Sequence, residues 1–376
     1  MKRTSLLLFT LVGLLVMVSA ALAAPPQSNV ALPPGPGNPR NSEGDVVQLK
    51  DGKVLLIYTH FVGGSGDHAK AHLASRISED GGQTWSDEDQ LVIPNEAGLN
   101  VMSVSLLRLA DGRLALFYLR KNSHVDCRPQ MRISTDEGKT WGEATSLIPD
   151  EDLGYYILNN DRVVQLSSGR LIAPVAQHVG PGMRIRNNAA ETLVYYSDDA
   201  GETWKRSQYA ARPPKRNGQD VLTQEPGVVE LTDGRLMMWI RTNAGSQFVT
   251  YSQDQGETWS QLEPSNMLSP ISPATIERIP KTGDLLLIWN DHSDIPASLK
   301  GKRTPLRSAI SKDDGKTWTH VKTLEDSPTG WYCYIALDFI DDHAVMAYCA
   351  GDRRENNGLA VTNTQRLPVE WFYEAE

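Results

Sequence analysis

An eight-residue pattern, S-x-D-x-G-x-T-W, occurs five times in this chain at intervals of 55 to 63 residues. The five copies begin at Ser78, Ser134, Ser197, Ser252 and Ser311. Repetition of so long a pattern at near-regular spacing indicates a repeat architecture, in which each unit buries its apolar face against its neighbours. We therefore expect several similar units arranged side by side.

A second repeat alternates with the first and predicts β-hairpins. Two apolar runs joined by a short turn occur six times, in residues 46–58, 104–118, 163–175, 228–240, 274–289 and 335–348. A turn such as Asp-Gly between alternating apolar runs is the strongest short-range signal of a hairpin. Helical periodicity does not extend over any long window. The fold class is therefore predicted to be all-β, as a single six-bladed β-propeller.

The S-x-D-x-G-x-T-W segments are interpreted as structural turns at the edges of the blades. Asp and Ser side chains can bond nearby backbone N–H groups in a tight turn, Gly supplies an unusual backbone conformation, and Trp packs beneath the turn. Binding of Ca²⁺ by the aspartates is the alternative. Each segment lacks the density of oxygen ligands that such a site needs, so the structural role is favoured.

The N-terminus has the features of a secretory signal peptide. Lys2 and Arg3 precede an apolar run, Leu6–Val18, and residues 21–23 supply a small-x-small cleavage pattern. The apolar run is short for a membrane-spanning helix, although an uncleaved anchor is the alternative. We expect residues 1–23 to be removed and the protein to be exported, to the periplasm or outside the cell.

Export permits disulfide formation. A Pro-rich linker is expected over residues 24–38 and the propeller over residues 39–376. Cys333 and Cys349 flank the turn of the sixth hairpin, so they could face each other; a disulfide and two free buried thiols are both open. Cys127 has no obvious partner, and three Cys cannot form a disulfide framework.

The charge balance excludes two classes of partner. The chain has 37 Lys and Arg against 46 Asp and Glu, a formal net charge of −9. A chain this acidic has no electrostatic footprint for nucleic acid, or for stable attachment to an anionic membrane surface. An anionic small substrate remains compatible with the composition if the fold gathers a few Arg side chains.

The five repeats resemble the Asp boxes, or bacterial neuraminidase repeats, of the sialidase superfamily, and the resemblance covers the chain from about Arg40 onward. Asp boxes alone say little about function, because non-catalytic propellers carry them too. Sialidases hold the substrate carboxylate with three Arg, and use a Tyr nucleophile assisted by a Glu and an Asp acid/base. The resemblance implies an exo-α-sialidase-like glycoside hydrolase acting on glycans, with a retaining mechanism and no metal or organic cofactor.

Four positions match the family's catalytic pattern in chain order. Glu225 opens the fourth hairpin and Arg241 closes it sixteen residues later, as the family's assisting glutamate and second arginine do. Arg303 lies eight residues before the fifth Asp box, in the place of the third arginine. Asp67 lies eleven residues before the first Asp box, in the place of the acid/base. Each alone could be structural, Glu225 and Arg241 as a buried ion pair, but the set together favours a site.

The resemblance places the nucleophile at the start of the sixth hairpin. Tyr334 matches best, because Leu337 then takes the family's apolar place three residues later. Tyr332 is the reserve, expected on the same face of the strand. A neutral Tyr suits a substrate with a carboxylate on its anomeric carbon, since an Asp or Glu nucleophile would meet a second negative charge.

The first arginine is where the sequence departs from the family. Arg40 is followed by Asn41 and Ser42 instead of Ile-Pro, and lies about two residues farther than usual from Gly52. Either Arg40 still reaches the site, or the carboxylate clamp has only two arginines. Arg120 is the candidate substitute ligand if Arg40 does not reach the site. The departure leaves three hypotheses: a sialidase, a propeller glycosidase for another acidic sugar, and a non-catalytic glycan-binding propeller.

Polar residues at other hairpin ends are further candidates for the cavity lining. They include His60, His178 and the segments 159–162 and 290–292. The histidines lack the spacing of metal ligands.

Overall fold

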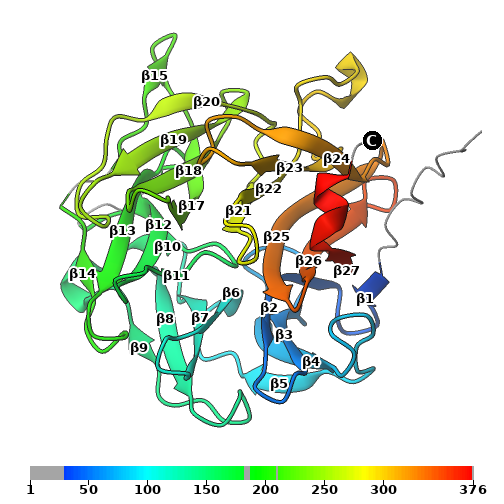
Figure 1. The fold of residues 1–376 in the computed structure, drawn as a ribbon. Helices are drawn as coiled ribbons and strands as arrows, with labels where there is room; N and C mark the ends of the chain where they lie inside the picture. The colour runs from blue at the N-terminus through cyan, green and yellow to red at the C-terminus, as the bar shows by residue number, and fades with distance from the viewer. Residues whose placement is uncertain (1–28, 182–186, 209–210, 375–376) are drawn as a thin grey trace, which may run out of the picture.

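The computed structural model describes residues 29–181, 187–208 and 211–374 (Figure 1). The predicted signal peptide, residues 1–23, lies outside the described residues. Within them the chain forms 27 β-strands and three short 3₁₀-helices: η1 (Asp150–Asp152), η2 (Ala297–Leu299) and η3 (Val369–Tyr373). None of the helices in these ranges has the length and apolar character to cross a membrane.

Six blades surround a central axis (Figure 1). The first, fourth and fifth are separate four-stranded sheets: β2 (Arg40–Gln48), β3 (Val54–Phe61), β4 (Ala71–Ser78) and β5 (Gln90–Ile93); β17 (Thr223–Glu230), β18 (Leu236–Thr242), β19 (Ser246–Ser252) and β20 (Glu263–Leu268); β21 (Thr275–Arg278), β22 (Leu285–Trp289), β23 (Leu306–Ser311) and β24 (Thr319–Glu325). In each, the predicted hairpin supplies the first two strands.

The second and third blades are hydrogen-bonded into one nine-stranded sheet. Their strands are β6 (Asn100–Arg108), β7 (Leu114–Lys121), β8 (Cys127–Ser134) and β9 (Thr145–Ser146), then β10 (Tyr155–Ile157), β11 (Val164–Gln165), β12 (Leu171–Val179), β13 (Glu191–Ser197) and β14 (Lys205–Arg206). A parallel pairing of Tyr155 with Cys127 joins the two blades. A small hairpin, β15 (Lys215–Arg216) with β16 (Gln219–Asp220), stands apart.

The N-terminal strand completes the last blade. Strands β25 (Gly330–Ile340), β26 (His343–Asp352) and β27 (Thr362–Pro368) form the sixth sheet, and β1 (Asn29–Leu32) pairs antiparallel with β27. These four residues lie in the segment expected to be a linker, so that expectation does not hold for them. The first and the last described strands thus share one blade. The prediction of an all-β fold with six blades is confirmed.

The Asp boxes are hydrogen-bonded turns, as predicted. In the first box Ser78 Oγ donates to Asp80 Oδ1 over 2.8 Å and accepts from Gly82 N over 2.8 Å. Asp80 accepts from the backbone N and from the hydroxyl of Thr84, over 2.8 and 2.6 Å. The other four boxes repeat these bonds. The carboxylates are therefore satisfied by their own turns.

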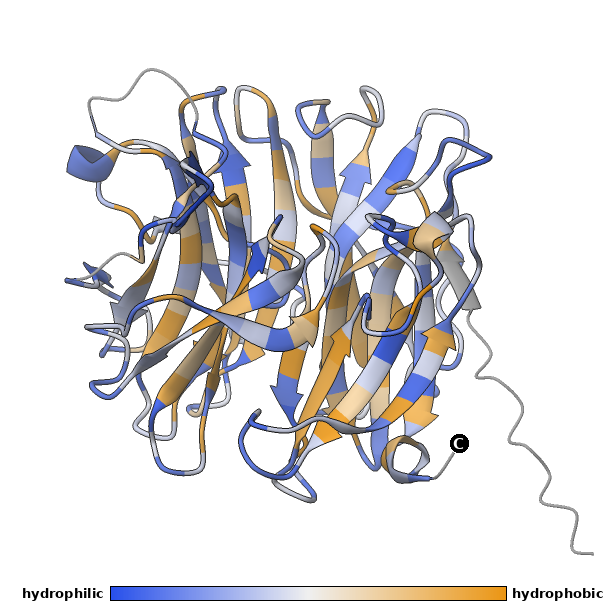
Figure 2. Cartoon of the chain, turned by 90° about the horizontal axis from the view of Figure 1, so that it is seen from above, coloured by the Kyte–Doolittle hydropathy of each residue, from blue (hydrophilic) through white to orange (hydrophobic). Residues whose placement is uncertain are grey.

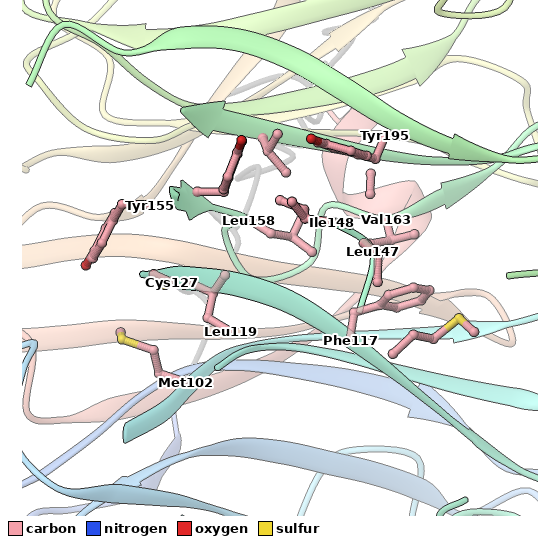
Figure 3. Packing of buried hydrophobic residues seen from close by; sticks show 14 of the residues in the cluster. Met102, Phe117, Leu119, Cys127, Leu147, Ile148, Tyr155, Leu158, Val163 and Tyr195 are labelled. Carbon is pink, nitrogen blue, oxygen red and sulfur yellow. The ribbon is translucent and has the colours of Figure 1, made fainter. Parts of the chain in front are cut away.

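The apolar core is divided among the interfaces between neighbouring blades. One cluster of buried side chains, which includes Phe117, Leu119, Leu158, Val163 and Tyr195, packs the second blade against the third (Figure 3). Comparable clusters fill the other five interfaces. Apolar residues follow the strands and hydrophilic residues occupy most loops (Figure 2). The two ends of the inner strands are left for polar residues.

Candidate active site

A cavity near the propeller axis collects side chains from five blades. Its lining consists of Glu43, Asp67, Met102, Ser103, Leu119, Lys121, Tyr155, Ile157, Asn159, His178, Gln224, Glu225 and Tyr334. The predicted acid/base, assisting glutamate and nucleophile are all among them. These three come from positions up to 267 residues apart, so only the closed ring brings them together.

A backbone irregularity recurs on the inner strands and directs side chains at this cavity. Glu43, Ser103, Asp161, Glu225 and Tyr334 all have positive φ angles, between 47° and 58°. On β2, β6, β17 and β25 the residue lies where the strand pairing shifts register. An extra residue at such a bulge re-aims a side chain that regular alternation would place elsewhere. Four of the five line the cavity.

Glu225 joins Tyr334 to Arg241. The Tyr334 hydroxyl donates to Glu225 Oε1 over 3.3 Å, and Arg241 Nη1 donates to Glu225 Oε2 over 2.6 Å. Burial raises the pKa of Tyr334 well above its ordinary value, and the charge of Glu225 raises it further, against the opposing effect of Arg303 and Arg241. The phenol is therefore protonated in the resting site, with a carboxylate placed to accept its proton.

Arg303 supplies a buried cation beside Tyr334. Its guanidinium carbon lies 5.5 Å from the centroid of the Tyr334 ring and 5.1 Å from that of Trp331. Burial lowers the pKa of Arg303, but the surrounding Cys333, Tyr334 and Glu225 outweigh this and raise it overall. Among the described residues, no hydrogen-bond acceptor meets its buried Nη1. Arg303 itself is not among the residues that line the cavity, so this charged donor lies behind the cavity wall.

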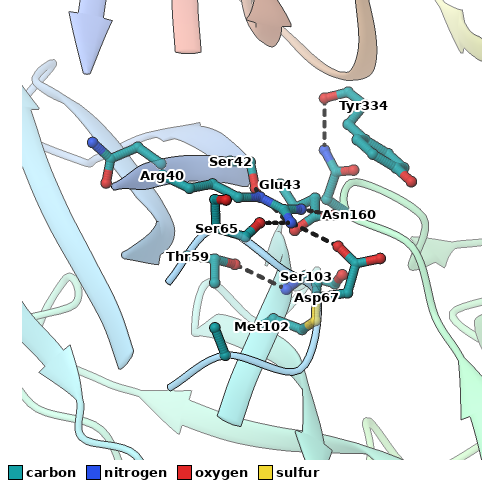
Figure 4. A network of polar contacts seen from close by, with 12 residues as sticks. Arg40, Ser42, Glu43, Thr59, Ser65, Asp67, Met102, Ser103, Asn160 and Tyr334 are labelled. Atoms are coloured by element: carbon teal, nitrogen blue, oxygen red, sulfur yellow. Dashed lines mark hydrogen bonds and ion pairs between the residues drawn. The ribbon is translucent and has the colours of Figure 1, made fainter. Parts of the chain in front are cut away.

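Arg40 reaches the site but is held by carboxylates of the protein (Figure 4). Its Nη1 donates to Asp67 Oδ1 over 2.6 Å, its Nη2 to Glu43 Oε1 over 3.0 Å, and its Nε to Ser42 Oγ over 2.8 Å. The side chain is only 1% exposed. Arg40 is therefore paired, unlike Arg303.

Asp67 is the exposed partner of this ion pair. Its carboxylate side chain is 60% exposed, while that of Arg40 is buried. Partial burial raises the pKa of Asp67, but the charge and hydrogen bond of Arg40, with help from Lys121, lower it overall. Asp67 is ionised as long as Arg40 remains bound to it.

The two basic residues at the end of β7 face opposite ways. Arg120, the predicted substitute ligand, is exposed and is not part of the cavity lining. Lys121 is 2% exposed and lines the cavity. Its Nζ donates to the backbone O of Asp67 over 2.8 Å and contacts Met102 Sδ at 3.0 Å. The prediction that Arg120 reaches the cavity is wrong. Side chains alternate along β7, so its neighbour Lys121 faces the cavity instead.

Tyr332 does not share the face of Tyr334. The register shift between Cys333 and Ala336 turns the two tyrosines apart. Tyr332 is 5% exposed and packs in the apolar cluster between the fifth and sixth blades. The expectation of a shared face is wrong, and of the two tyrosines only Tyr334 meets Glu225.

The cysteines of the sixth hairpin face each other as free thiols. Cys333 pairs with Cys349 across β25 and β26, and all three Cys of the chain are free. Burial raises the pKa of Cys333, but a hydrogen bond with Cys349 and the charge of Arg303 lower it to about 7. Cys127 packs in the core cluster shown in Figure 3.

Several cavity residues were absent from the sequence-based set. Glu43, Ser103, Lys121 and Gln224 line the cavity without having been predicted. His178 and Asn159 were candidates from their places at hairpin ends, and both line it. His60 is outside the cavity lining, and its Nδ1 lies 3.0 Å from Asp89 Oδ2. Within the described residues, no group of three or more His, Cys, Asp or Glu could hold a metal ion.

Comparison with known proteins gives a family match and distant relatives. Residues 94–348 match the family described as BNR repeat-like domain. A sialidase of Bacteroides fragilis is 30% identical over 225 residues, covering 56% of this chain and 37% of that protein. A sialidase of Micromonospora viridifaciens is 25% identical over 384 residues, covering 88% of this chain and 56% of that protein. The chain spans about half the length, or less, of these two relatives.

Solved structures share the architecture over nearly the whole chain. A Dyadobacter fermentans protein of unknown function has a TM-score of 0.71 at 17% identity, covering 91% of this chain and 98% of that one. A Streptococcus pneumoniae sialidase has a TM-score of 0.69 at 17% identity, covering 93% of this chain and 71% of that one. At these identities the likeness shows the fold.

Proposed function

The chain belongs to the BNR repeat-like family, and on that premise we propose that it is an exo-α-sialidase-like glycoside hydrolase. It would remove a terminal sialic acid, or a related acidic sugar, from a glycan with retention of configuration. The observation that carries the proposal is Glu225, hydrogen-bonded to both Tyr334 and Arg241 across the cavity that Asp67 also lines. The distant sialidase relatives support it.

Binding of the substrate carboxylate is the proposed first step. Arg303 has a buried N–H without an acceptor among the described residues, and Arg241, which is paired with Glu225, supplies the second guanidinium. Planar guanidinium groups hold a carboxylate through paired hydrogen bonds. The incoming carboxylate also competes with Asp67 for Arg40. When the Arg40–Asp67 ion pair breaks, Asp67 loses the charge and the hydrogen bond that lower its pKa. Asp67 can then take up the proton that it later donates.

Two displacements at the anomeric carbon follow. Tyr334 Oη forms a bond to this carbon while Glu225 accepts the phenol proton, and the glycosidic bond breaks as Asp67 protonates the leaving oxygen. Asp67, now ionised, takes a proton from a water whose oxygen attacks the same carbon. The bond to Tyr334 breaks, and Glu225 returns the proton to the phenolate. Two inversions give net retention.

A tyrosine nucleophile fits the charge of this cavity. Glu43, Asp67 and Glu225 already line it, and the substrate adds a carboxylate on the reacting carbon. A fourth protein carboxylate as nucleophile would meet repulsion in a site of low dielectric. A neutral phenol avoids this repulsion until Glu225 removes its proton.

Hydrolysis of an aryl sialoside by matched variants tests the proposal. We expect Tyr334→Phe and Asp67→Ala to lower kcat/KM by a factor of about 10³ or more. Tyr332→Phe, which alters a core residue outside the site, should retain more than a tenth of the activity. A Tyr334→Phe variant that hydrolyses the substrate as fast as wild type would refute the assignment of the nucleophile.

A glycosidase for a different acidic sugar is the second candidate. The ion pairs of the protein favour it, because Arg40 is held by Glu43 and Asp67 and Arg241 is held by Glu225. Of the three predicted arginines, Arg303 is then the one without an ion pair among the described residues. A panel of aryl uronides and ulosonides decides between the two candidates by the ratio of kcat/KM values. Binding of these sugars without turnover of any would leave a glycan-binding propeller.

Export of the protein is also proposed, from the N-terminal sequence alone. Mass spectrometry of the protein isolated from its native cells should find an N-terminus at Ala24, with the protein outside the cytoplasm. An intact N-terminus on cytoplasmic protein would contradict the proposal.

A further inference from the structure

A second pocket is joined to the catalytic cavity by an ion pair, because Arg40 lines the pocket and its partner Asp67 lines the cavity. Arg40, Ser65, Trp331, Arg353 and the loop of residues 356–360 line it, around a volume of about 270 Å³. This is several times the ~30 Å³ that a water occupies, so a sugar-sized group has room. We call it the donor pocket, after the unused hydrogen-bond donors in its wall.

The contacts of Arg40 with Ser65 and Asp67 bring the donor pocket close to the bond that is cleaved. Arg40 Nη1 donates both to the Ser65 backbone O, over 3.1 Å, and to Asp67 Oδ1, over 2.6 Å. Ser65 and the proposed acid, Asp67, lie two residues apart on the same loop. Because Asp67 protonates the leaving oxygen, the sugar attached to that oxygen lies on this side of the cavity.

The donor pocket is lined by basic and not by acidic side chains, in an acidic protein. Its described lining contains two guanidinium groups and no Asp or Glu, whereas the whole chain carries a net charge of −9. Arg40 is neutralised by Glu43 and Asp67. Within the described part of the chain, Arg353 has no ion-pair partner, and its Nη2 donates only to the Pro328 carbonyl, over 2.9 Å. The negative charge that acts on Arg353 is that of the adjacent Asp352, which is itself paired with Arg354.

Two guanidiniums without an ion-pair partner among the described residues lie against one indole ring. The Arg303 carbon is 5.1 Å and the Arg353 carbon 6.0 Å from the centroid of the Trp331 ring. Among the described residues, Arg303 Nη1, Arg353 Nη1 and Trp331 Nε1 are all buried without an acceptor. Buried donors without acceptors cost about 1–3 kcal/mol each. An anion on each side of Trp331 would offset this cost.

The wall that carries Arg353 is a fixed structure. The backbone N of Asp352 donates to Asn357 Oδ1 over 2.7 Å, and Thr329 Oγ1 donates to Asp352 Oδ2 over 2.9 Å. A side chain on Gly358 would come within 2.9 Å of the Trp331 ring, so the loop lies directly on the indole. Arg353 is therefore presented by a built loop.

We propose that the donor pocket binds the sugar next to the one that is cleaved, and that Arg353 holds a carboxylate on it. The substrate class is then a glycan that ends in two consecutive acidic sugars. The inference rests on the proposed function, because that function places the cleaved sugar in the cavity that Tyr334 lines. Arg303 would hold the first carboxylate and Arg353 the second, on either side of Trp331.

Substrate selectivity of matched variants tests the donor pocket. The substrates are an alkyl glycoside of two α-linked sialic acids and a sialyl galactoside, whose second sugar is neutral. We expect Arg353→Gln to lower the ratio of their kcat/KM values, acidic over neutral, by about tenfold. Arg353→Lys should recover part of the ratio. Arg354→Gln, which changes an exposed neighbour paired with Asp352, should leave it unchanged.

A binding measurement separates this inference from the proposed function. Calorimetric titration with the same disialoside uses Tyr334→Phe protein, with and without Arg353→Gln, so no turnover is needed. About tenfold weaker binding with Arg353→Gln, but not with Arg354→Gln, supports the pocket even if wild type hydrolyses neither substrate. Equal selectivity and equal affinity in the two Arg variants would overturn the inference.

Discussion

Lys121 is a cation beside the proposed acid that the family resemblance did not point to. Its ammonium group donates to the Asp67 backbone and lowers the Asp67 pKa through its charge. It touches no reacting atom in the proposed mechanism, so we assign it a positioning role. Together with Asn100, which donates to the same carbonyl over 3.0 Å, it holds the loop that carries Asp67.

Removal of the Lys121 charge should move the pH profile. Asp67 must be protonated to act as an acid, so kcat/KM falls as the pH rises through its pKa. Lys121→Met removes a charge that lowers this pKa, and the alkaline limb should therefore move to higher pH by up to about one unit. Arg120→Met, on the exposed face of the same strand, is the control. Identical limbs in both variants would contradict the assigned role.

The bulges of the inner strands explain why sequence alone places some site residues correctly and others wrongly. Spacing from the Asp boxes identifies Asp67 and Arg303, because each lies at a fixed distance from a repeated turn. Strand alternation misplaces Tyr332, since the shift between Cys333 and Ala336 reverses the expected facing. No local pattern marks a bulge that a non-glycine residue forms, so its effect is visible only in the folded ring.

Backbone strain at one bulge can be measured apart from chemistry. Ser103 has a φ of 58° on β6 and no proposed catalytic role. Glycine adopts this conformation without strain, whereas a β-branched residue does not. We expect Ser103→Gly to be as stable as wild type or more stable, and Ser103→Val to lose about 2 kcal/mol of unfolding free energy. Urea denaturation measures both, and a less stable Gly variant with a stable Val variant would show that the bulge is unstrained.

The whole ring also gathers carboxyl groups from different blades, one of them buried and three half-buried. Asp45, Asp161, Glu277 and Asp338 come from the first, third, fifth and sixth blades and border one cavity together. Burial raises the pKa of each, and mutual repulsion adds to the effect on the first three. The pKa of Asp338 rises to about 6, chiefly through burial. Closure of the ring therefore brings these four carboxyl groups together, and unfolding separates them.

Stability should consequently decrease from pH 5 to pH 8. A carboxyl whose pKa is higher in the folded state stabilises the fold below its unfolded pKa, near 4, and this contribution is lost as the pH rises through the folded value. For Asp338 the window runs from about pH 4 to 6. Asp338→Asn should raise the unfolding free energy at pH 8 by about 1–2 kcal/mol and flatten the pH dependence. Asp341→Asn, at the exposed turn of the same hairpin, should change neither; equal effects would contradict this account.

The fold as a whole was predictable because its signals repeat. Five Asp boxes and six hairpins define the blades. Because the same signals recur, an irregular spacing in one repeat does not change the number of blades predicted. The closure was not predictable: β1 is four residues long and lies in a Pro-rich segment without alternation, and its pairing with β27 depends on the ring bringing both chain ends together. The same closure places Arg40, on the first blade, near Tyr334, on the last.

Trapping of the glycosyl-enzyme tests the central claim, that Tyr334 is the nucleophile of a retaining glycosidase. A 2,3-difluoro sialic acid supplies fluoride as the leaving group, so the Tyr334 oxygen gains the sugar as the carbon–fluorine bond breaks. Peptide mass spectrometry after digestion should then find one sugar per chain, on the peptide that carries Tyr334, and none in Tyr334→Phe. A sugar attached to another residue, or turnover of an aryl sialoside with inversion of configuration, would contradict the account.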